Sequence, residues 1–177
     1  MKILPNHTSR NHHFQDLMLH RVHDILLVAS PYDAFILEED GRLTEQILHE
    51  YLGMNLSYAP RVWQANTASY AMDLLSRRSV DLIIVMLRIS DMDFITFGTQ
   101  VKEQYNNKPI ILLAFDESEI KQLPENRDNF MDNVFVWAGN ASVFPAIIKN
   151  IEDTKNIKRD TRKGDVRSII YIEDTPR

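Results

Sequence analysis

The sequence predicts an α/β protein in which a five-stranded parallel sheet is covered by helices on both faces. Five short apolar runs, rich in Val, Ile and Leu, alternate along the chain with segments whose apolar residues recur at helical spacing. Unbroken apolar runs of this kind are typical of strands buried on both faces of a parallel sheet. Because each strand is followed by a helix, right-handed crossovers place helices on the two faces.

The predicted strands and helices follow one another in a regular order. The strands are expected at residues 24–30, 62–66, 81–86, 109–115 and 133–138. The helices are expected at residues 32–52, 68–78, 94–105 and 141–158, with a short one at 117–123. In the first of these helices the inward residues are expected to be Ile36, Leu43, Ile47, Leu48 and Tyr51.

Start and stop signals support these boundaries. Pro31 ends the first strand because proline cannot donate to a ladder, and Thr67 is a favourable cap for the helix that begins at residue 68. Pro124 and the polar run ENRDN are expected to shorten the helix at 117–123. Pro145 is tolerated because it lies in the first turn of the last helix.

Composition excludes several classes of protein. The 177 residues are 44% hydrophobic, enough for one full core, and contain no apolar run near the ~20 residues of a membrane helix. The net charge of −5 comes from mixed acids and bases without a basic block, so neither nucleic acid nor a membrane is an expected partner. With no cysteine and no apolar signal segment at the N-terminus, the expected location is the cytoplasm.

The two ends of the chain differ from the central region of residues 24–154. Residues 1–23 are polar and histidine-rich, and their apolar spacing predicts a short helical leader; the apolar residues are Phe14, Leu17, Met18 and Val22. The leader also offers candidate metal ligands, although no carboxylate lies at a matching spacing; they are His12, His13, His20 and His23. Residues 155–166 predict a charged helical extension or linker, and residues 167–177 predict the first strand of a truncated second domain.

No motif of a nucleotide-binding or hydrolytic enzyme is present. The five glycines, at positions 41, 53, 98, 139 and 164, are too far apart for a dinucleotide fingerprint or a phosphate-binding loop. No serine lies in a glycine-flanked elbow, and no pair of histidines has zinc-protease spacing with a glutamate. We therefore expect no enzymatic activity and no cofactor.

Three runs of sequence resemble the receiver domain of two-component response regulators. They are ILLVAS for its first strand, DLIIVMLRISDMD for its third strand and following loop, and PIILLAF for its fourth strand. The resemblance implies a flavodoxin-like sheet with strand order 2-1-3-4-5. In that family two acids after the first strand and an aspartate ending the third hold Mg²⁺. That aspartate accepts the phosphoryl group, which a hydroxyl after strand four and a lysine after strand five then hold.

Carried over to this sequence, all of these positions have lost the chemistry of the family. The acidic pair falls on Ala29 and Ser30, the phosphoacceptor on Met86, the hydroxyl on Ala114, and the lysine on Trp137. A thioether cannot accept a phosphoryl group, and methyl and indole groups cannot bind Mg²⁺ or neutralise phosphate. The resemblance therefore implies a degenerate receiver that is not phosphorylated.

Two alternatives to a fully inert site remain open. Asp33, Asp91 and Asp116 lie in expected loops at the carboxyl end of the sheet and could assemble a displaced cation site, or could be solvated acids and helix caps. Met86 and Trp137 are expected to meet, either as core filling or as the wall of a small-ligand pocket.

A second resemblance concerns the protein around this region. SPYDAFILEEDGRLTEQI and SIIYIEDTPR are similar to bacterial proteins that carry receiver-like modules ahead of a phosphoenolpyruvate synthase-like, PEP/pyruvate-binding part. The resemblance implies that residues 169–172 begin a second receiver, with Glu173 and Asp174 as its acidic pair.

The expected function is that of a pseudo-receiver, a signalling module that acts through protein contacts. Its expected partners are neighbouring domains of the full-length protein, a second receiver among them, or a second copy bound through the C-terminal helix. The alternative function is a sensor that binds a small metabolite at the carboxyl-end cleft of the sheet.

Overall fold

The computed structural model of the protein describes residues 18–38, 43–54, 58–121, 123–137, 139 and 141–164. They contain a five-stranded parallel sheet with the strand order β2-β1-β3-β4-β5. The strands are β1 (Asp24–Val28), β2 (Arg61–Ala65), β3 (Leu82–Val85), β4 (Ile110–Ala114) and β5 (Asn133–Val136). The predicted fold class is confirmed, and β2 and β5 form the two edges of the sheet.

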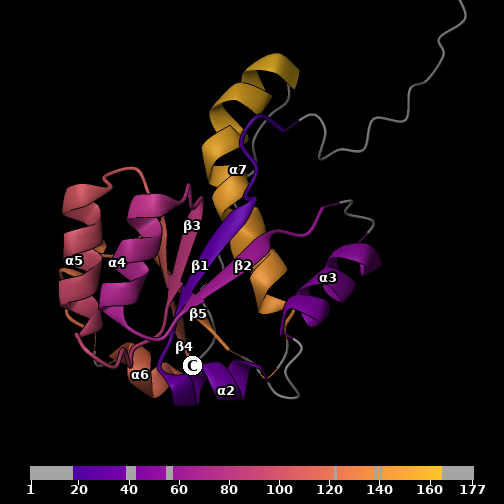
Figure 1. Cartoon of the computed structure of the whole chain (residues 1–177). Helices are drawn as coiled ribbons and strands as arrows, with labels where there is room; N and C mark the ends of the chain where they lie inside the picture. Colours follow the sequence, from indigo (N-terminus) through magenta and orange to yellow (C-terminus); the bar gives the residue numbers. More distant parts are fainter. Residues whose placement is uncertain are drawn as a thin grey trace, which may run out of the picture.

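The helices cover the sheet on both faces (Figure 1). Helices α4 (Ala68–Arg77) and α5 (Phe94–Gln104) lie on one face, whereas α7 (Val143–Gly164) and α3 (Leu43–Gly53) lie on the other. Alternate residues of each strand supply the two cores: Ile25 and Leu27 of β1 face α7, and Leu26 and Val28 face α4. A strand with both faces buried must be apolar throughout, which is the pattern the sequence has.

Two helix starts follow directly from capping residues. Thr67 accepts a hydrogen bond from the Tyr70 amide at 3.1 Å and caps α4, as predicted. Asp93 accepts one from the Thr96 amide at 2.9 Å and caps α5. Each side chain satisfies an amide that the first turn of a helix leaves without a partner.

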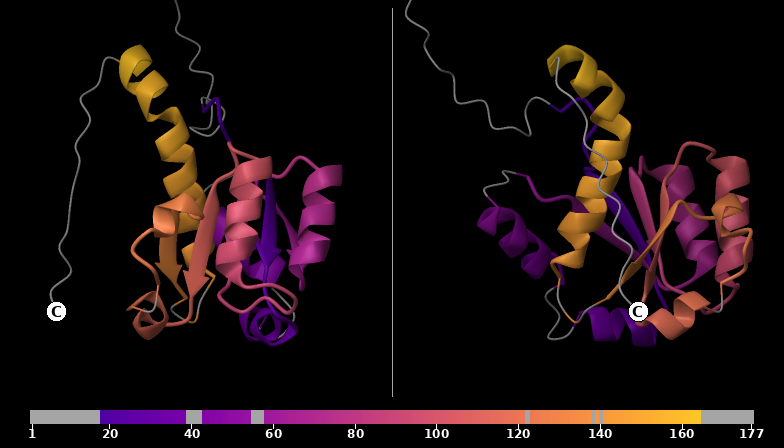
Figure 2. Two further views of the ribbon diagram at one scale, coloured as in Figure 1. Left: turned by 90° about the vertical axis from the view of Figure 1, so that its left-hand side faces the viewer. Right: turned by 180° about the vertical axis from the view of Figure 1, so that it is seen from behind.

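The first predicted helix, at 32–52, is wrong as a single element. The chain forms α2 (Pro31–Leu37) and α3 (Leu43–Gly53) instead. Helix α2 lies across the carboxyl end of the sheet, while α3 contacts α7 on one face (Figures 1 and 2). One straight helix cannot reach both partners, and Leu48, predicted to face inward, is 46% exposed.

The crossover from β4 to β5 is short. Helix α6 (Glu117–Lys121) has five residues, and a 3-10 turn, η1 (Arg127–Asn129), follows it. This agrees with the prediction that Pro124 and the polar run after it replace the later turns of this helix. Helices α2 and α6 both lie at the carboxyl end of the sheet (Figure 2).

Helix α7 is 22 residues long and extends past the amino end of the sheet (Figure 1). Its Asn156 donates to the His20 carbonyl at 2.7 Å and accepts from the His20 amide at 3.0 Å, and its Glu152 accepts from the Val22 amide at 3.0 Å. Residues 18–23 are therefore held on α7 as an extended segment and form no helix. The first part of the predicted leader, with His12 and His13, lies outside the described residues, as does the segment with Glu173 and Asp174.

None of the described helices is long and apolar enough to cross a lipid bilayer.

Candidate functional site

The five positions to which the resemblance assigned the receiver chemistry lie at the carboxyl edge of the sheet. Ala29 and Ser30 follow β1, Met86 follows β3, Ala114 ends β4 and Trp137 follows β5. Backbone hydrogen bonds hold them in register: the Met86 amide donates to Val28 at 2.9 Å, and the Trp137 amide donates to Ala114 at 2.7 Å. The strand order therefore brings together positions that are 108 residues apart in the chain (137 minus 29).

Most of these positions are filled by apolar side chains packed in the core. Ala29, Met86 and Ala114 are 2%, 1% and 0% exposed. Met86 belongs to the core on the α7 side, and Trp137 packs against the same core with its ring edge-on to Phe144, at 6.1 Å between ring centroids. Met86 and Trp137 thus fill the core at the place where the resemblance implies a phosphoryl site.

Ser30 serves a structural role. Its hydroxyl accepts a hydrogen bond from the Asp33 amide at 3.1 Å, which caps α2, and its own amide donates to the Arg88 carbonyl at 3.0 Å. Proline at the first position of α2 completes a favourable helix start, because its missing amide would have no partner there. These contacts fix α2 against the loop after β3.

An ion pair between a buried carboxylate and an exposed guanidinium lies at this edge of the sheet. The Asp33 carboxylate, on α2, is 1% exposed and accepts from Arg88 at 3.0 Å from an Nη atom and 3.2 Å from Nε. Both of these bonds end on Oδ1, and Nε also lies 3.4 Å from Oδ2, so two donors of one planar guanidinium hold the carboxylate. Arg88 lies two residues beyond Met86, on the loop after β3, and its side chain is 57% exposed. The guanidinium therefore covers the carboxylate and faces solvent.

Arg88 also reaches the loop after β4. Its guanidinium lies 3.9 Å from the Glu119 carboxylate and 5.7 Å from the centre of the Phe115 ring. Glu119 in turn accepts from the Phe115 amide at 2.7 Å. The hydrogen bond to Asp33 raises the pKa of Arg88 above its ordinary value, and the nearby Glu119 acts in the same direction. One permanent cation thus links the loops that follow β1, β3 and β4.

Solved structures with this architecture are response regulator receiver domains. The signal receiver domain of an HD domain-containing protein from Pseudomonas fluorescens Pf-5 matches with a TM-score of 0.58 at 20% identity, over 80% of this chain and 95% of that one. A receiver domain protein from Clostridium thermocellum matches with a TM-score of 0.58 at 13% identity, over 77% and 99%. The chain has the receiver fold.

A third match was solved as a complex. The response regulator protein TrrA from Thermotoga maritima, in complex with Mg²⁺ and BeF, matches with a TM-score of 0.54 at 16% identity, over 73% of this chain and 98% of that one. No protein-family profile and no curated protein matches the sequence. At these identities the structural matches establish the fold alone.

The other acids at this end of the receiver fold cap helices. Asp91 accepts hydrogen bonds from the Ala68 amide at 2.6 Å and from the amide and hydroxyl of Ser69 at 3.1 and 2.6 Å. These bonds, led by that from the Ser69 hydroxyl, lower the pKa of Asp91. Asp116 accepts from Ser118 and Glu119 at the start of α6, which lowers its pKa as well.

Asp33, Asp91 and Asp116 are therefore not brought together. Each has its own donors, and across the described parts of the chain no three His, Cys, Asp or Glu side chains are grouped to hold a metal ion. The structure favours the reading of these acids as caps and pairing groups over a displaced cation site. Arg88, which the sequence analysis did not single out, is the residue that gives Asp33 its role.

A cleft of about 260 Å³ opens beside the degenerate positions, between β1, β2, α2 and α4. Its walls include Ala29 and Ala65, and its polar groups are Gln64, Asn66 and Tyr70. No acidic or basic side chain lines it; the full lining is Leu27, Ala29, Pro31, Ala34, Gln64, Ala65, Asn66 and Tyr70. A ligand of this cleft would be recognised by shape and by neutral hydrogen bonds.

Proposed function

We propose that this chain is a pseudo-receiver: a signalling module that is not phosphorylated, has no enzymatic activity and acts through contacts with other proteins. The observation that carries the proposal is the ion pair between the buried Asp33 carboxylate and the exposed Arg88 guanidinium at the carboxyl edge of the sheet. It occupies the region where the resemblance implies exchangeable Mg²⁺ and phosphate. The charge of the Asp33 carboxylate is thus paired within the chain.

The chemistry of the surrounding side chains supports the same conclusion. Phosphoryl transfer to a receiver needs a carboxylate acceptor, oxygen ligands for Mg²⁺ and a cation for the phosphoryl oxygens. Met86, Ala29 and Ala114 offer a thioether and two methyl groups, all buried. Arg88, a cation at this edge, is already shared by Asp33 and Glu119.

A fixed ion pair also bears on signalling. In a switchable receiver the charge at this edge changes when phosphate arrives, and the loops respond. Here one guanidinium links the loops after β1, β3 and β4 through contacts that need no phosphate. We therefore infer that the module has a single conformation at this edge and serves as a docking platform.

The partners belong to the same proposal. The full-length protein would supply neighbouring domains, a second receiver among them, with a phosphoenolpyruvate synthase-like part beyond it. Helix α7 offers a surface for such a domain or for a second copy, because it extends past the sheet and carries Ile157 at 46% exposure. A cytoplasmic location, without contact to nucleic acid or membrane, completes the proposal.

The proposal is tested by incubating the protein with Mg²⁺ and either acetyl phosphate or beryllofluoride. We expect no mass increase of an acyl phosphate in the intact protein and no change in amide NMR shifts around the loops after β1, β3 and β4. A competent receiver domain treated in parallel is the positive control. An acyl-phosphate adduct on this chain would overturn the proposal.

A second candidate function is a sensor of a small metabolite, favoured by the cleft of about 260 Å³ beside Ala29. Its uncharged lining fits a neutral ligand better than phosphoenolpyruvate, pyruvate or a nucleotide. Thermal shift with these anions and with neutral nucleosides separates the two functions, because a ligand that binds only the folded state raises the melting temperature saturably. A pure docking module gives no such response.

A further inference from the structure

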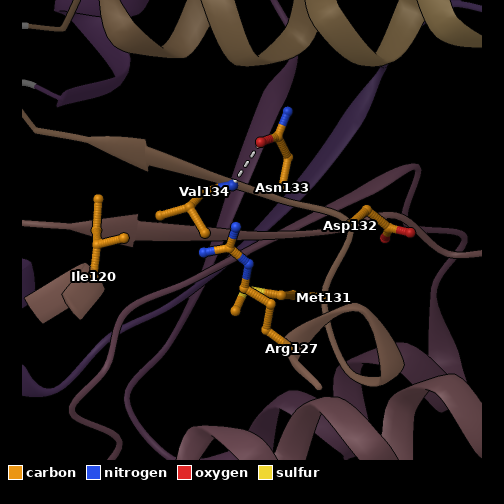
Figure 3. A pocket seen from close by; sticks show the side chains of 6 residues that line it. All are labelled: Ile120, Arg127, Met131, Asp132, Asn133 and Val134. Carbon is orange, nitrogen blue, oxygen red and sulfur yellow. Dashed lines mark hydrogen bonds between the residues drawn. The ribbon is translucent and has the colours of Figure 1, made fainter. Parts of the chain in front are cut away.

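A second pocket lies beside β5, the edge strand on the other side of the sheet from β2. It has a volume of about 290 Å³ and is formed by α6, η1 and β5 (Figure 3). The residues that line it are Ile120, Arg127, Met131, Asp132, Asn133 and Val134. Because α6 has only five residues, the crossover leaves this part of the sheet uncovered.

The charge available in this pocket is positive. Arg127 is exposed, and within the described residues no carboxylate lies within ion-pair distance of it. Asp132 is already engaged, because it accepts from Lys102 Nζ at 2.6 Å and from the Ile110 amide at 2.7 Å. In Figure 3 the Arg127 guanidinium lies beside Val134, and Ile120 lies on the far side of Val134. The pocket thus combines one guanidinium with apolar walls.

Among the residues that the structure describes, the strand beside the pocket pairs on one side only, with β4. The Trp137 amide donates to Ala114 of β4, and alternate amides of a parallel strand point to opposite sides, so those of Val134 and Val136 point away from β4. The Val134 amide is satisfied by its own neighbour, the Asn133 side chain, at 2.8 Å. A backbone carbonyl of an added strand could take the place of that side chain.

The two edges of the sheet are protected unequally. On β2, Arg61 and Trp63 both bond to Asp24, and Arg78 stacks 3.8 Å above the Trp63 ring, so bulky charged groups cover that edge. Charged side chains on an edge strand discourage further pairing. The four residues of β5, NVFV, include neither a charge nor a proline. An added strand would therefore find β5 the more accessible edge.

We propose that β5 and the adjoining pocket bind an extended peptide segment that carries a carboxylate side chain. The segment pairs with β5 as a sixth strand, through the outward amides of Val134 and Val136, and places its carboxylate on Arg127. Apolar residues flanking the acid pack on Ile120 and Val134. This inference rests on the proposed docking function and names the chemistry of the partner.

Disulfide tethering tests the inference, because the chain has no cysteine of its own. Lys121→Cys places one thiol on α6 beside the pocket, and Lys158→Cys, on the exposed face of α7, is the matched control. Each variant is equilibrated, in mercaptoethanol, with two competing peptides, each extended by a C-terminal Cys that is supplied as its mixed disulfide with mercaptoethanol. Thiol–disulfide exchange then forms the protein–peptide disulfide and releases mercaptoethanol. Before that Cys, both peptides have five residues of alternating Val and Thr, with Glu or Gln at the centre.

The ratio of the two adducts in the intact mass reports the relative affinity. We expect the Glu peptide to be captured about three- to tenfold more than the Gln peptide at Lys121→Cys, as for a partly exposed charge-assisted bond, and equally at Lys158→Cys. Arg127→Gln in the Lys121→Cys background should bring the ratio to about one. Equal capture at Lys121→Cys, or a preference that survives Arg127→Gln, overturns the proposal.

Amide hydrogen exchange of the Glu-peptide adduct tests strand pairing separately. We expect slower exchange at Val134 and Val136 than in the untethered variant. A Glu preference without that protection would assign the pocket to a small anion and overturn the peptide proposal. Neither failure would touch the acetyl phosphate experiment, which examines the carboxyl edge of the sheet.

Discussion

Replacing Arg88 with methionine removes the guanidinium from the carboxyl edge while keeping an apolar stem over Phe115. The Asp33 carboxylate, 1% exposed, then loses its only hydrogen-bonding side chain within the described residues. A buried charge left without its partner costs about 3–5 kcal/mol. Because the Arg88 side chain is 57% exposed, water partly replaces it, and we expect a loss of about 1–3 kcal/mol.

Urea unfolding at neutral pH measures this loss, with Arg162→Met on the exposed part of α7 as the matched control. For a chain of this size a loss of about 2 kcal/mol lowers the melting temperature by roughly 4–8 °C. Asp33→Asn, alone and combined with Arg88→Met, completes a double-mutant cycle. We expect a coupling energy between the two residues of about 1–2 kcal/mol. If Arg88→Met is as stable as Arg162→Met, or if the two changes are simply additive, the ion pair does not hold this edge.

Three further predictions concern packing, a buried acid and a helix cap. Gly98→Ala should destabilise the protein by about 1–3 kcal/mol, because a Cβ there would lie 2.4 Å from the Phe130 backbone oxygen; Gly53→Ala, with open space around it, should be neutral or slightly stabilising in thermal melts. Equal effects of the two changes would refute the packing argument. Burial raises the pKa of Glu152, so its contribution to stability is full below about 4.5 and is lost as the pH rises through the raised value. Glu152→Gln should therefore gain stability relative to wild type as the pH rises from about 4.5, and a difference independent of pH would contradict this. Asp91→Ala should cost about 1 kcal/mol in urea unfolding, through loss of the bonds to the start of α4, and added Mg²⁺ should not change that value; a larger loss in the presence of Mg²⁺ would instead indicate a cation site.

The fold could be predicted because its signals are local and repeated. Each inner strand is an unbroken apolar run, and Thr67 marks a helix start where the structure has one. The failure at residues 32–52 has the opposite origin. Helical spacing predicts one helix that packs on one neighbouring element. Here α2 is bound to the loop after β3 through the Asp33–Arg88 ion pair, whereas α3 packs on α7. Spacing along the chain carries no information about two different partners.

The sequence could predict which polar residues are missing from the site, but not the ion pair that forms there. The apolar residues at positions 29, 86 and 114 are visible in the sequence because they replace expected polar ones. The pairing of Asp33 with Arg88 joins residues 55 apart, and an arginine in a loop is most often solvated. The one available signal was a cation two residues after Met86, in a loop otherwise rich in acids.

Restoring a carboxylate at Met86 tests how far the site has changed. Met86→Asp would bury a third carboxylate near a single guanidinium that Asp33 and Glu119 already share, in a position 1% exposed. We expect a loss of about 2–5 kcal/mol, whereas Met86→Leu, which conserves volume, should lose less than about 1.5 kcal/mol.

The folded fraction of Met86→Asp should still take no phosphoryl group from acetyl phosphate and Mg²⁺. Ala29 and Trp137 would still offer neither a ligand for Mg²⁺ nor a cation for the phosphoryl oxygens. Circular dichroism distinguishes a folded, unreactive variant from an unfolded one. Phosphorylation of the variant would mean that the rest of the edge keeps receiver chemistry and that Met86 alone blocks it. If the folded variant does not react, phosphorylation is prevented by the whole carboxyl edge of the sheet, including the Asp33–Arg88 ion pair, and not by Met86 alone.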